Sequence, residues 1–162
     1  MKRQLGVLDL PADRMEGEVV AALFFEDERP LRGPAALLDW RLDGRLTRML
    51  QAGELTGKAG ESAVVAAGSK IEADWVLFYG GGRLAGLGGD AWRNHIGSLL
   101  GAAKKAGFCR IALCLAPLAG LKSEEVVQAV HAEVHRLAEG GVECLLSVDD
   151  SGQRKSSQDE SA

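Results

Sequence analysis

The chain is predicted to be an α/β protein in which helices cover both faces of a central mixed or parallel sheet. Short apolar runs of strand character alternate along it with segments of helical periodicity. The run Ile111–Leu115 is apolar throughout, as expected for a strand that is covered on both faces. Its 162 residues, 46% of them hydrophobic, suit one domain with a single core, which we place at residues 1–148.

The first half is predicted to hold two strands and one long helix. The polar turn PADRMEGE separates the strands, and a loop with a proline at each end, Pro30–Pro34, follows them. A helical pattern then continues through Ala35–Ala52 and ends at Gly53, because glycine commonly ends helices. The two strands are expected at Gln4–Leu8 and Val19–Phe25.

The second half is predicted to contain two further helices. Asp90 is expected to cap a helix over Ala91–Ala106 that stops at Gly107. Ser123 begins another helix, which closes at Gly140–Gly141. The remaining strands are expected at Ser62–Ala67, Trp75–Tyr79, Ile111–Leu115 and Val142–Val148. Five or six strands with three helices result, and the polar segment Asp149–Ala162 is predicted to be a disordered tail.

The glycine-rich loop Gly80–Gly89 is the first candidate site. A loop of this kind between a strand and a helix can hold an anion on its backbone amides, and Arg83 could pair with a phosphate. Against this, its spacing matches no standard phosphate motif, and a carboxylate at Asp90 would occupy the amides of the helix. A tight packing turn is therefore favoured over a ligand site. The candidate residues are Gly80, Gly81, Gly82, Arg83, Gly86, Gly88 and Gly89.

A second candidate is a basic ridge on the predicted helix Ala35–Ala52. At 100° per residue Arg41, Arg45 and Arg48 fall on one flank, away from the apolar side. Such a ridge could contact an acidic protein, a phosphate or another subunit. A solvated face is the commoner outcome, and it is favoured here.

No metal site, cofactor or catalytic centre is predicted. His131 and His135 are four residues apart on one helix, but a metal site needs a third ligand. The cysteines Cys109, Cys114 and Cys144 have no CxxC spacing, and no GxSxG motif occurs. The net charge of −4 makes nucleic acid an unlikely partner. With no apolar run of about 18 residues and no signal-peptide core, we expect a cytoplasmic protein without a membrane segment.

Taken in order, these segments resemble the N-terminal domain of the leucyl aminopeptidase family, the M17 zinc peptidases. The resemblance rests on VVAALFFEDERPLRGPAALLDWRLDGRLTRMLQAGELTGKAGESAVVAAGSKIEADWVLFYGGG. Its marks are the strand end Phe25-Glu26, the turn with Gly57-Lys58 and Gly60-Glu61, and the later helix in IGSLLGAAKKAGFCRIAL. It implies a macro-domain-like, three-layer α/β/α sandwich around a central mixed sheet.

In that family the catalytic chemistry belongs to a separate C-terminal domain, which has a two-metal site and an NTDAEGR signature. The 162 residues contain no such signature, so no catalytic residue is carried over. The polar end of the chain, in place of a linking helix, favours a natural stop over a fragment.

The resemblance therefore implies a non-catalytic, stand-alone relative that acts in protein interaction, assembly or regulation, by self-association or with a protein partner. The alternative is a small-molecule module that binds a nucleotide or an ADP-ribose-type anion at the glycine loop.

Overall fold

The computed structural model describes residues 5–118, 120–137 and 141–149. Gln4, Gly140 and residues 150–162, on which some of the predictions above fall, lie outside the described part. Within it, a six-stranded sheet has the order β1-β6-β5-β2-β4-β3. Each neighbouring pair is parallel except β3 and β4, so the sheet is mixed, as predicted. The strands are β1 (Leu5–Val7), β2 (Val19–Phe24), β3 (Ser62–Ala66), β4 (Trp75–Gly80), β5 (Arg110–Leu115) and β6 (Glu143–Val148).

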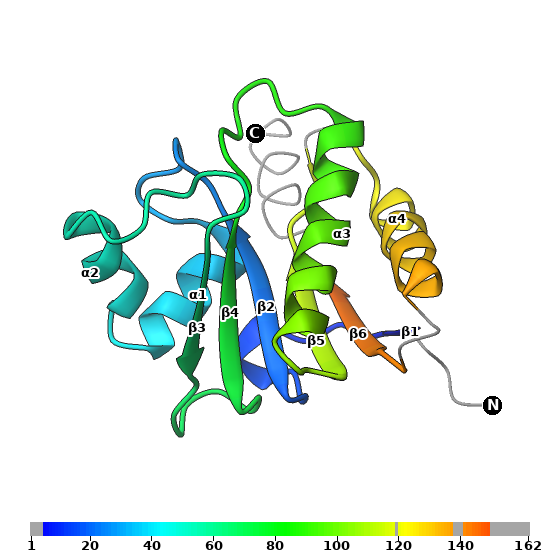
Figure 1. Cartoon of the computed structure of the whole chain (residues 1–162), viewed down its shortest axis with the longest axis horizontal. Coiled ribbons are helices and arrows are strands. Elements are labelled where there is room, and N and C mark those ends of the chain that lie inside the picture. Colours follow the sequence, from blue (N-terminus) through cyan, green and yellow to red (C-terminus); the bar gives the residue numbers. More distant parts are fainter. Residues whose placement is uncertain (1–4, 119, 138–140, 150–162) are drawn as a thin grey trace, which may run out of the picture.

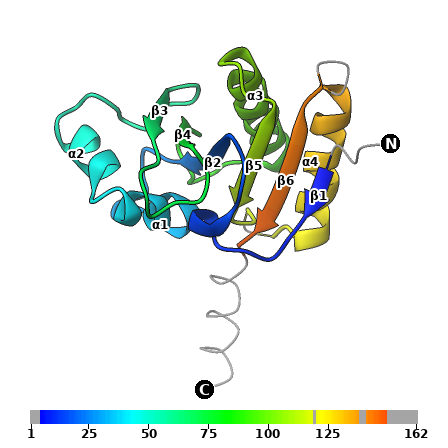
Figure 2. The same cartoon turned by 90° about the horizontal axis from the view of Figure 1, so that it is seen from below.

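Helices pack on both faces of this sheet, which gives the predicted three layers (Figure 1). Helices α3 and α4 cover one face, and α1 and α2 lie on the other, as the second view also shows (Figure 2). A short 3-10 turn, η1 (Ala12–Arg14), follows the first strand and contacts α1. The helices are α1 (Gly33–Arg41), α2 (Arg45–Gln51), α3 (Gly89–Lys105) and α4 (Ser123–Arg136).

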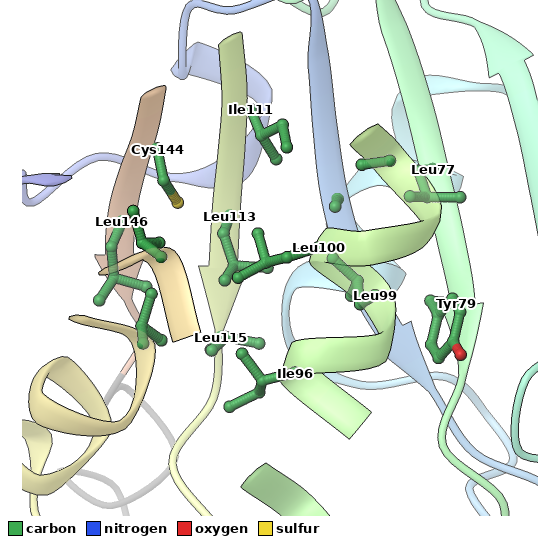
Figure 3. Packing of buried hydrophobic residues seen from close by; sticks show 14 of the residues in the cluster. Leu77, Tyr79, Ile96, Leu99, Leu100, Ile111, Leu113, Leu115, Cys144 and Leu146 are labelled. Atoms are coloured by element: carbon green, nitrogen blue, oxygen red, sulfur yellow. The ribbon is translucent and has the colours of Figure 1, made fainter. Parts of the chain in front are cut away.

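Successive residues of β2 and β4 face opposite layers, so each strand supplies two cores. Val19 and Ala21 belong to the cluster under α3 and α4, while Val20 and Ala22 belong to the cluster under α1 and α2. In the first cluster, Ile96, Leu99 and Leu100 of α3 lie over strand residues such as Leu77, Leu113 and Leu146 (Figure 3). Full burial of one such side chain contributes about 1.5–3 kcal/mol. The central strands are therefore apolar on both faces, which is why their sequences are continuous apolar runs.

The single helix predicted over Ala35–Ala52 is wrong, because the chain forms two helices there. The break falls at Asp43 and Gly44, whose φ angles of 56° and 79° are left-handed. The buried carboxylate of Asp39 accepts hydrogen bonds from the Leu46 amide at 2.7 Å and the Thr47 hydroxyl at 2.5 Å. Asp39 thereby caps the start of α2 from within α1, and the chain turns at the left-handed pair.

Candidate functional site

Strands β2 and β5 are neighbours whose following helices cover opposite faces of the sheet. β2 leads into α1 on one face, and β5 leads into α4 on the other. In α/β proteins, ligands bind outside the carboxyl ends of parallel strands at such a divergence. A cavity of about 320 Å³ opens at this point. Its walls are formed by Leu23, Phe25, Glu28, Arg32, Gly33, Pro34, Leu84, Trp92, Cys114, Leu115, Ala116, Pro117 and Leu118. We call this cavity the cleft.

The cleft combines an apolar interior with a few polar groups. Trp92, Cys114 and Leu115 are each only 2% exposed. Glu28 and Arg32 add one acid and one base, and partial burial raises the pKa of the Glu28 carboxyl. Gly33, the first residue of α1, adopts a φ of 62°, and no side chain caps the helix there. This mixture suits a small molecule with a ring and an anionic group.

The start of the predicted glycine loop is a packing turn. A Cβ on Gly80 would lie 2.1 Å from the Lys58 carbonyl oxygen, and one on Gly81 would lie 2.5 Å from the Phe25 ring. The amides of Gly80, Gly81 and Gly82 donate to backbone carbonyls at 2.7, 2.9 and 2.8 Å. These three amides are therefore engaged and do not cradle an anion.

The rest of the glycine-rich loop passes the cleft, and its residue Leu84 lines the cleft wall. The structure brings none of the six predicted glycines to the lining of the cleft, and Arg83 is exposed. The amides of Leu84 and Ala85 donate to the Asp27 carboxylate at 2.7 and 2.9 Å. These two hydrogen bonds, the Ala85 bond first, lower the pKa of Asp27.

The predicted N-cap at Asp90 is wrong. Helix α3 begins at Gly89 with Gly88 as its cap residue, and no side chain caps it. The Asp90 side chain is 99% exposed and pairs with Arg93 at 3.1 Å. Since a glycine takes the cap position, the carboxylate moves to the first turn, where it still favours the helix dipole. Asp90 therefore does not occupy the amides of this helix as a cap. A Cβ on Gly86 or Gly88 would meet nothing within 4 Å.

The three arginines of the predicted ridge are distributed over two helices. Arg41 ends α1, whereas Arg45 and Arg48 belong to α2. The Arg41 side chain donates to buried Asp13 at 2.9 Å and lies 4.5 Å above the Trp40 ring. Arg45 and Arg48 are exposed, and Arg48 donates to the Asp43 carbonyl. The continuous helical ridge is therefore interrupted by the turn at Asp43 and Gly44.

The cysteines and histidines do not form a site in the described residues. Burial raises the pKa of Cys114 and of Cys144 to about 12, so both are thiols at neutral pH. His131 and His135 stack at a ring separation of 6.4 Å on the exposed side of α4. Among the described residues, no three His, Cys, Asp or Glu side chains gather where they could hold a metal ion.

Most of the residues that line the cleft were not predicted from the sequence. Glu28, Arg32 and Gly33 lie in or beside a segment that was interpreted only as a loop, and Ala116–Leu118 received no interpretation. The available signal was topological. Both segments follow apolar strands, and the carboxyl ends of parallel strands meet at one edge of the sheet. Without the strand order, nothing indicated that β2 and β5 are neighbours.

The strand order, the three layers and the cleft define a macrodomain-like domain. A Trypanosoma brucei macrodomain solved in complex with ADP-ribose superposes with a TM-score of 0.72 at 18% identity, covering 94% of this chain and 67% of that one. Residues 21–140 match the N-terminal domain of the cytosol aminopeptidase family, and the chain belongs to that family. This confirms the resemblance found in the sequence.

Two aminopeptidases are among the similar proteins. A probable cytosol aminopeptidase of a Cyanothece strain is 35% identical over 89 residues, which are 55% of this chain and 18% of the relative. A mutant tomato leucine aminopeptidase superposes with a TM-score of 0.64 at 19% identity, covering 91% of this chain and 32% of that one. The chain thus spans less than a third of the length of either relative. Within its described part, no helix is both long and apolar enough to cross a bilayer.

Proposed function

We propose that the domain is a non-catalytic binding module whose cleft receives a nucleotide-like small molecule. The observation that carries this proposal is the cavity at the divergence of β2 and β5. On this ground we propose the cleft in place of the glycine loop as the ligand site, and ligand binding ahead of assembly as the leading function.

Of the two charged groups in the cleft, Arg32 suits a ligand with an anionic part. Arg32 lines the cleft and stands immediately before α1, whose first turn has no side-chain cap. A guanidinium beside uncapped helix amides attracts phosphate or carboxylate groups. The apolar interior at Trp92 and Leu115 would receive a ring, since rings gain most by leaving water.

A second hollow extends the cleft. It has a volume of about 250 Å³ and shares Pro34 and Cys114 with the cleft, so the two are adjacent. Asp9 lies on its wall and could accept a hydrogen bond from a ring amine. A nucleotide, which carries an anionic group, a ring and an amine on that ring, has a group for Arg32, for the apolar interior and for Asp9. The macrodomain of Trypanosoma brucei was solved with such a molecule, ADP-ribose.

A thermal-shift titration with AMP, ADP and ADP-ribose tests the proposal. Ligand at 100 times its Kd should stabilise the domain by about 2.7 kcal/mol. Arg32→Ala should weaken binding, and Ala116→Trp should fill the cleft and abolish it. Arg45→Ala, which removes an exposed arginine on α2, is the matched control and should bind like the wild type. If no nucleotide shifts the wild-type transition, the proposed function is wrong.

Assembly with a second copy or another protein is a second candidate function. Trp40 is 66% exposed, and Trp75 and Val64 are 43% and 42% exposed. Trp75 pairs with Ala66, and Val64 pairs with Leu77, so Trp75 and Val64 lie on the same sheet face near the β3 edge. Exposed aromatic residues are typical of interfaces. Light scattering after size-exclusion chromatography tests this function. A wild type that stays monomeric at high concentration would refute self-association. Any association that the wild type shows, with itself or with a protein partner, should be lost in Trp75→Ser.

A further inference from the structure

The carboxylate of Asp27 connects two loops that border the cleft. It follows β2 and accepts hydrogen bonds from Leu84 and Ala85, which are 57 and 58 residues further along the chain. Leu84 lines the cleft, and it also lines a neighbouring hollow of about 360 Å³ together with Asp27. The same hollow contains Glu28 and Arg32 of the cleft, so the two spaces adjoin. The Asp27 contact therefore stands at the boundary between the cleft and this outer hollow.

The two backbone amides that hold the Asp27 carboxylate have the chemistry of an anion site. Two consecutive backbone amides donate to one carboxylate at 2.7 and 2.9 Å, as amides do in sites for phosphate. The guanidinium of Arg83 precedes them and acts on the same carboxylate through its charge. Asp27 is exposed, so it can leave this position without opening the core.

We propose that Asp27 is an exchangeable internal ligand, whose carboxylate occupies the Leu84 and Ala85 amides until the anionic group of a bound molecule displaces it. The inference rests on the proposed function, because it takes the incoming group to be the phosphate of a ligand in the cleft. While Asp27 stays in place, the loop after β2 is tied to the loop before α3. After its displacement, these loops are joined through the bound anion, so the ligand itself closes this side of the cleft.

This assignment also explains how the loop could act as an anion site although its first three glycine amides are engaged. The site lies further along, at Leu84 and Ala85, and it is already filled by a tethered carboxylate. A tethered group competes at a high effective concentration, so a free anion binds weakly to the wild type.

Amide NMR titration with pyrophosphate tests the proposal, with the shifts of Leu84 and Ala85 as the readout. Asp27→Ala should bind pyrophosphate at these amides at least about tenfold more tightly than the wild type, since the internal competitor is removed, and Asp27→Asn, which keeps an oxygen acceptor but loses the charge, should bind it more tightly by a smaller factor. Two controls separate this effect from others. Asp90→Asn removes one exposed negative charge close to the same loop without touching the amides. Glu18→Gln disturbs an equivalent contact, to the Cys109 and Arg110 amides at 2.9 and 2.8 Å. This contact lies at the amino ends of β2 and β5, whereas the cleft lies at their carboxyl ends.

The proposal is overturned if neither Asp27 variant binds pyrophosphate more tightly, or if Asp90→Asn tightens binding equally, which would indicate a general charge effect. Nucleotide binding is followed separately through the amide of Ala116 in the cleft. If the Asp27 variants bind nucleotide with the same affinity as the wild type, the proposed function stands and the exchange is refuted. Pyrophosphate that binds tightly to Asp27→Ala while no nucleotide binds either protein would support the exchange and refute the proposed function.

Discussion

Replacing Gly80 by alanine should be among the most damaging small changes in this chain. The added Cβ would lie 2.1 Å from the Lys58 carbonyl oxygen, whereas a carbon and a carbonyl oxygen normally stay about 3.3 Å apart or more. The overlap exceeds 1 Å and is with backbone, so either the end of β4 or the turn at Lys58 must move. Overpacking of this kind costs about 1–3 kcal/mol.

Moving either segment also strains two hydrogen bonds. The Gly80 amide donates to the Glu61 carbonyl at 2.7 Å, and its carbonyl accepts from Gly60 at 3.1 Å. Partial loss of these two hydrogen bonds, at about 1 kcal/mol each, adds to the overpacking and brings the total destabilisation to about 3 kcal/mol. For a domain of this size that corresponds to a fall in Tm of about 6–12 °C. Urea unfolding followed by circular dichroism would measure the free energy of unfolding, and a thermal melt would measure Tm.

Gly88→Ala is the matched control, because it lies in the same loop with a φ of −83° and would meet nothing within 4 Å. Alanine restricts the unfolded chain but is a poorer cap residue than glycine, so these opposing effects should keep the change in the free energy of unfolding within about 1 kcal/mol. If Gly80→Ala were as stable as Gly88→Ala, the interpretation of Gly80 as a packing glycine would be refuted.

Two further predictions concern buried groups, and a third concerns the dependence of stability on pH. Asp39→Ala should lower the free energy of unfolding by about 3 kcal/mol, because it removes charged hydrogen bonds to the start of α2 and leaves the Leu46 amide buried without that partner. Chemical unfolding measures this loss. At pH 8 a thiol reagent should label Cys109 alone in the folded protein, since burial raises the pKa of Cys114 and Cys144 to about 12. The same raised pKa values make stability fall as pH rises from 9.0 toward about 12, because the unfolded chain ionises these thiols first.

Each of these two predictions has its own control. Asp43→Asn removes the charge of an acid whose side chain is 81% exposed and keeps a residue type that tolerates the left-handed φ of 56°, so its stability should stay close to that of the wild type. An equal loss in both variants would argue against a specific cap at Asp39. In denaturant all three cysteines should react. Rapid labelling of three thiols in the folded protein would contradict the burial of Cys114 and Cys144.

The sheet and its layers were largely predictable, and the reason is the double burial of the central strands. Runs such as Ile111–Leu115 face two helical layers, so they are apolar at each position and stand out in the sequence. The strand order was not predictable in the same way, because the pairing of β2 with β5 depends on contacts between residues about 90 positions apart. The cleft depends on that pairing and was therefore missed.

Helix ends were less predictable than helices. Asp90 satisfied the usual preference for a cap residue, yet the extended backbone at Gly88 begins the helix earlier, and local preference could not separate these choices. At the break after α1, the decisive contact is the Asp39 carboxylate on Leu46. Its spacing of seven residues resembles a helical repeat, so the pattern concealed the turn. The Asp27 contact, across 57 residues, left no local signal at all.

The position of β6 bears on how the chain folds as it is made. β6 lies between β1 and β5, so within the described residues β1, the earliest strand of the sheet, pairs only with β6, the latest. Until residues 143–148 emerge, the edge of β5 that later receives β6 is open, and β1 has no strand beside it. Such long-range pairing slows folding and exposes strand edges to other chains. Completion of the sheet thus depends on the last strand, and a chaperone that shields β5 during synthesis would be most useful before that strand arrives.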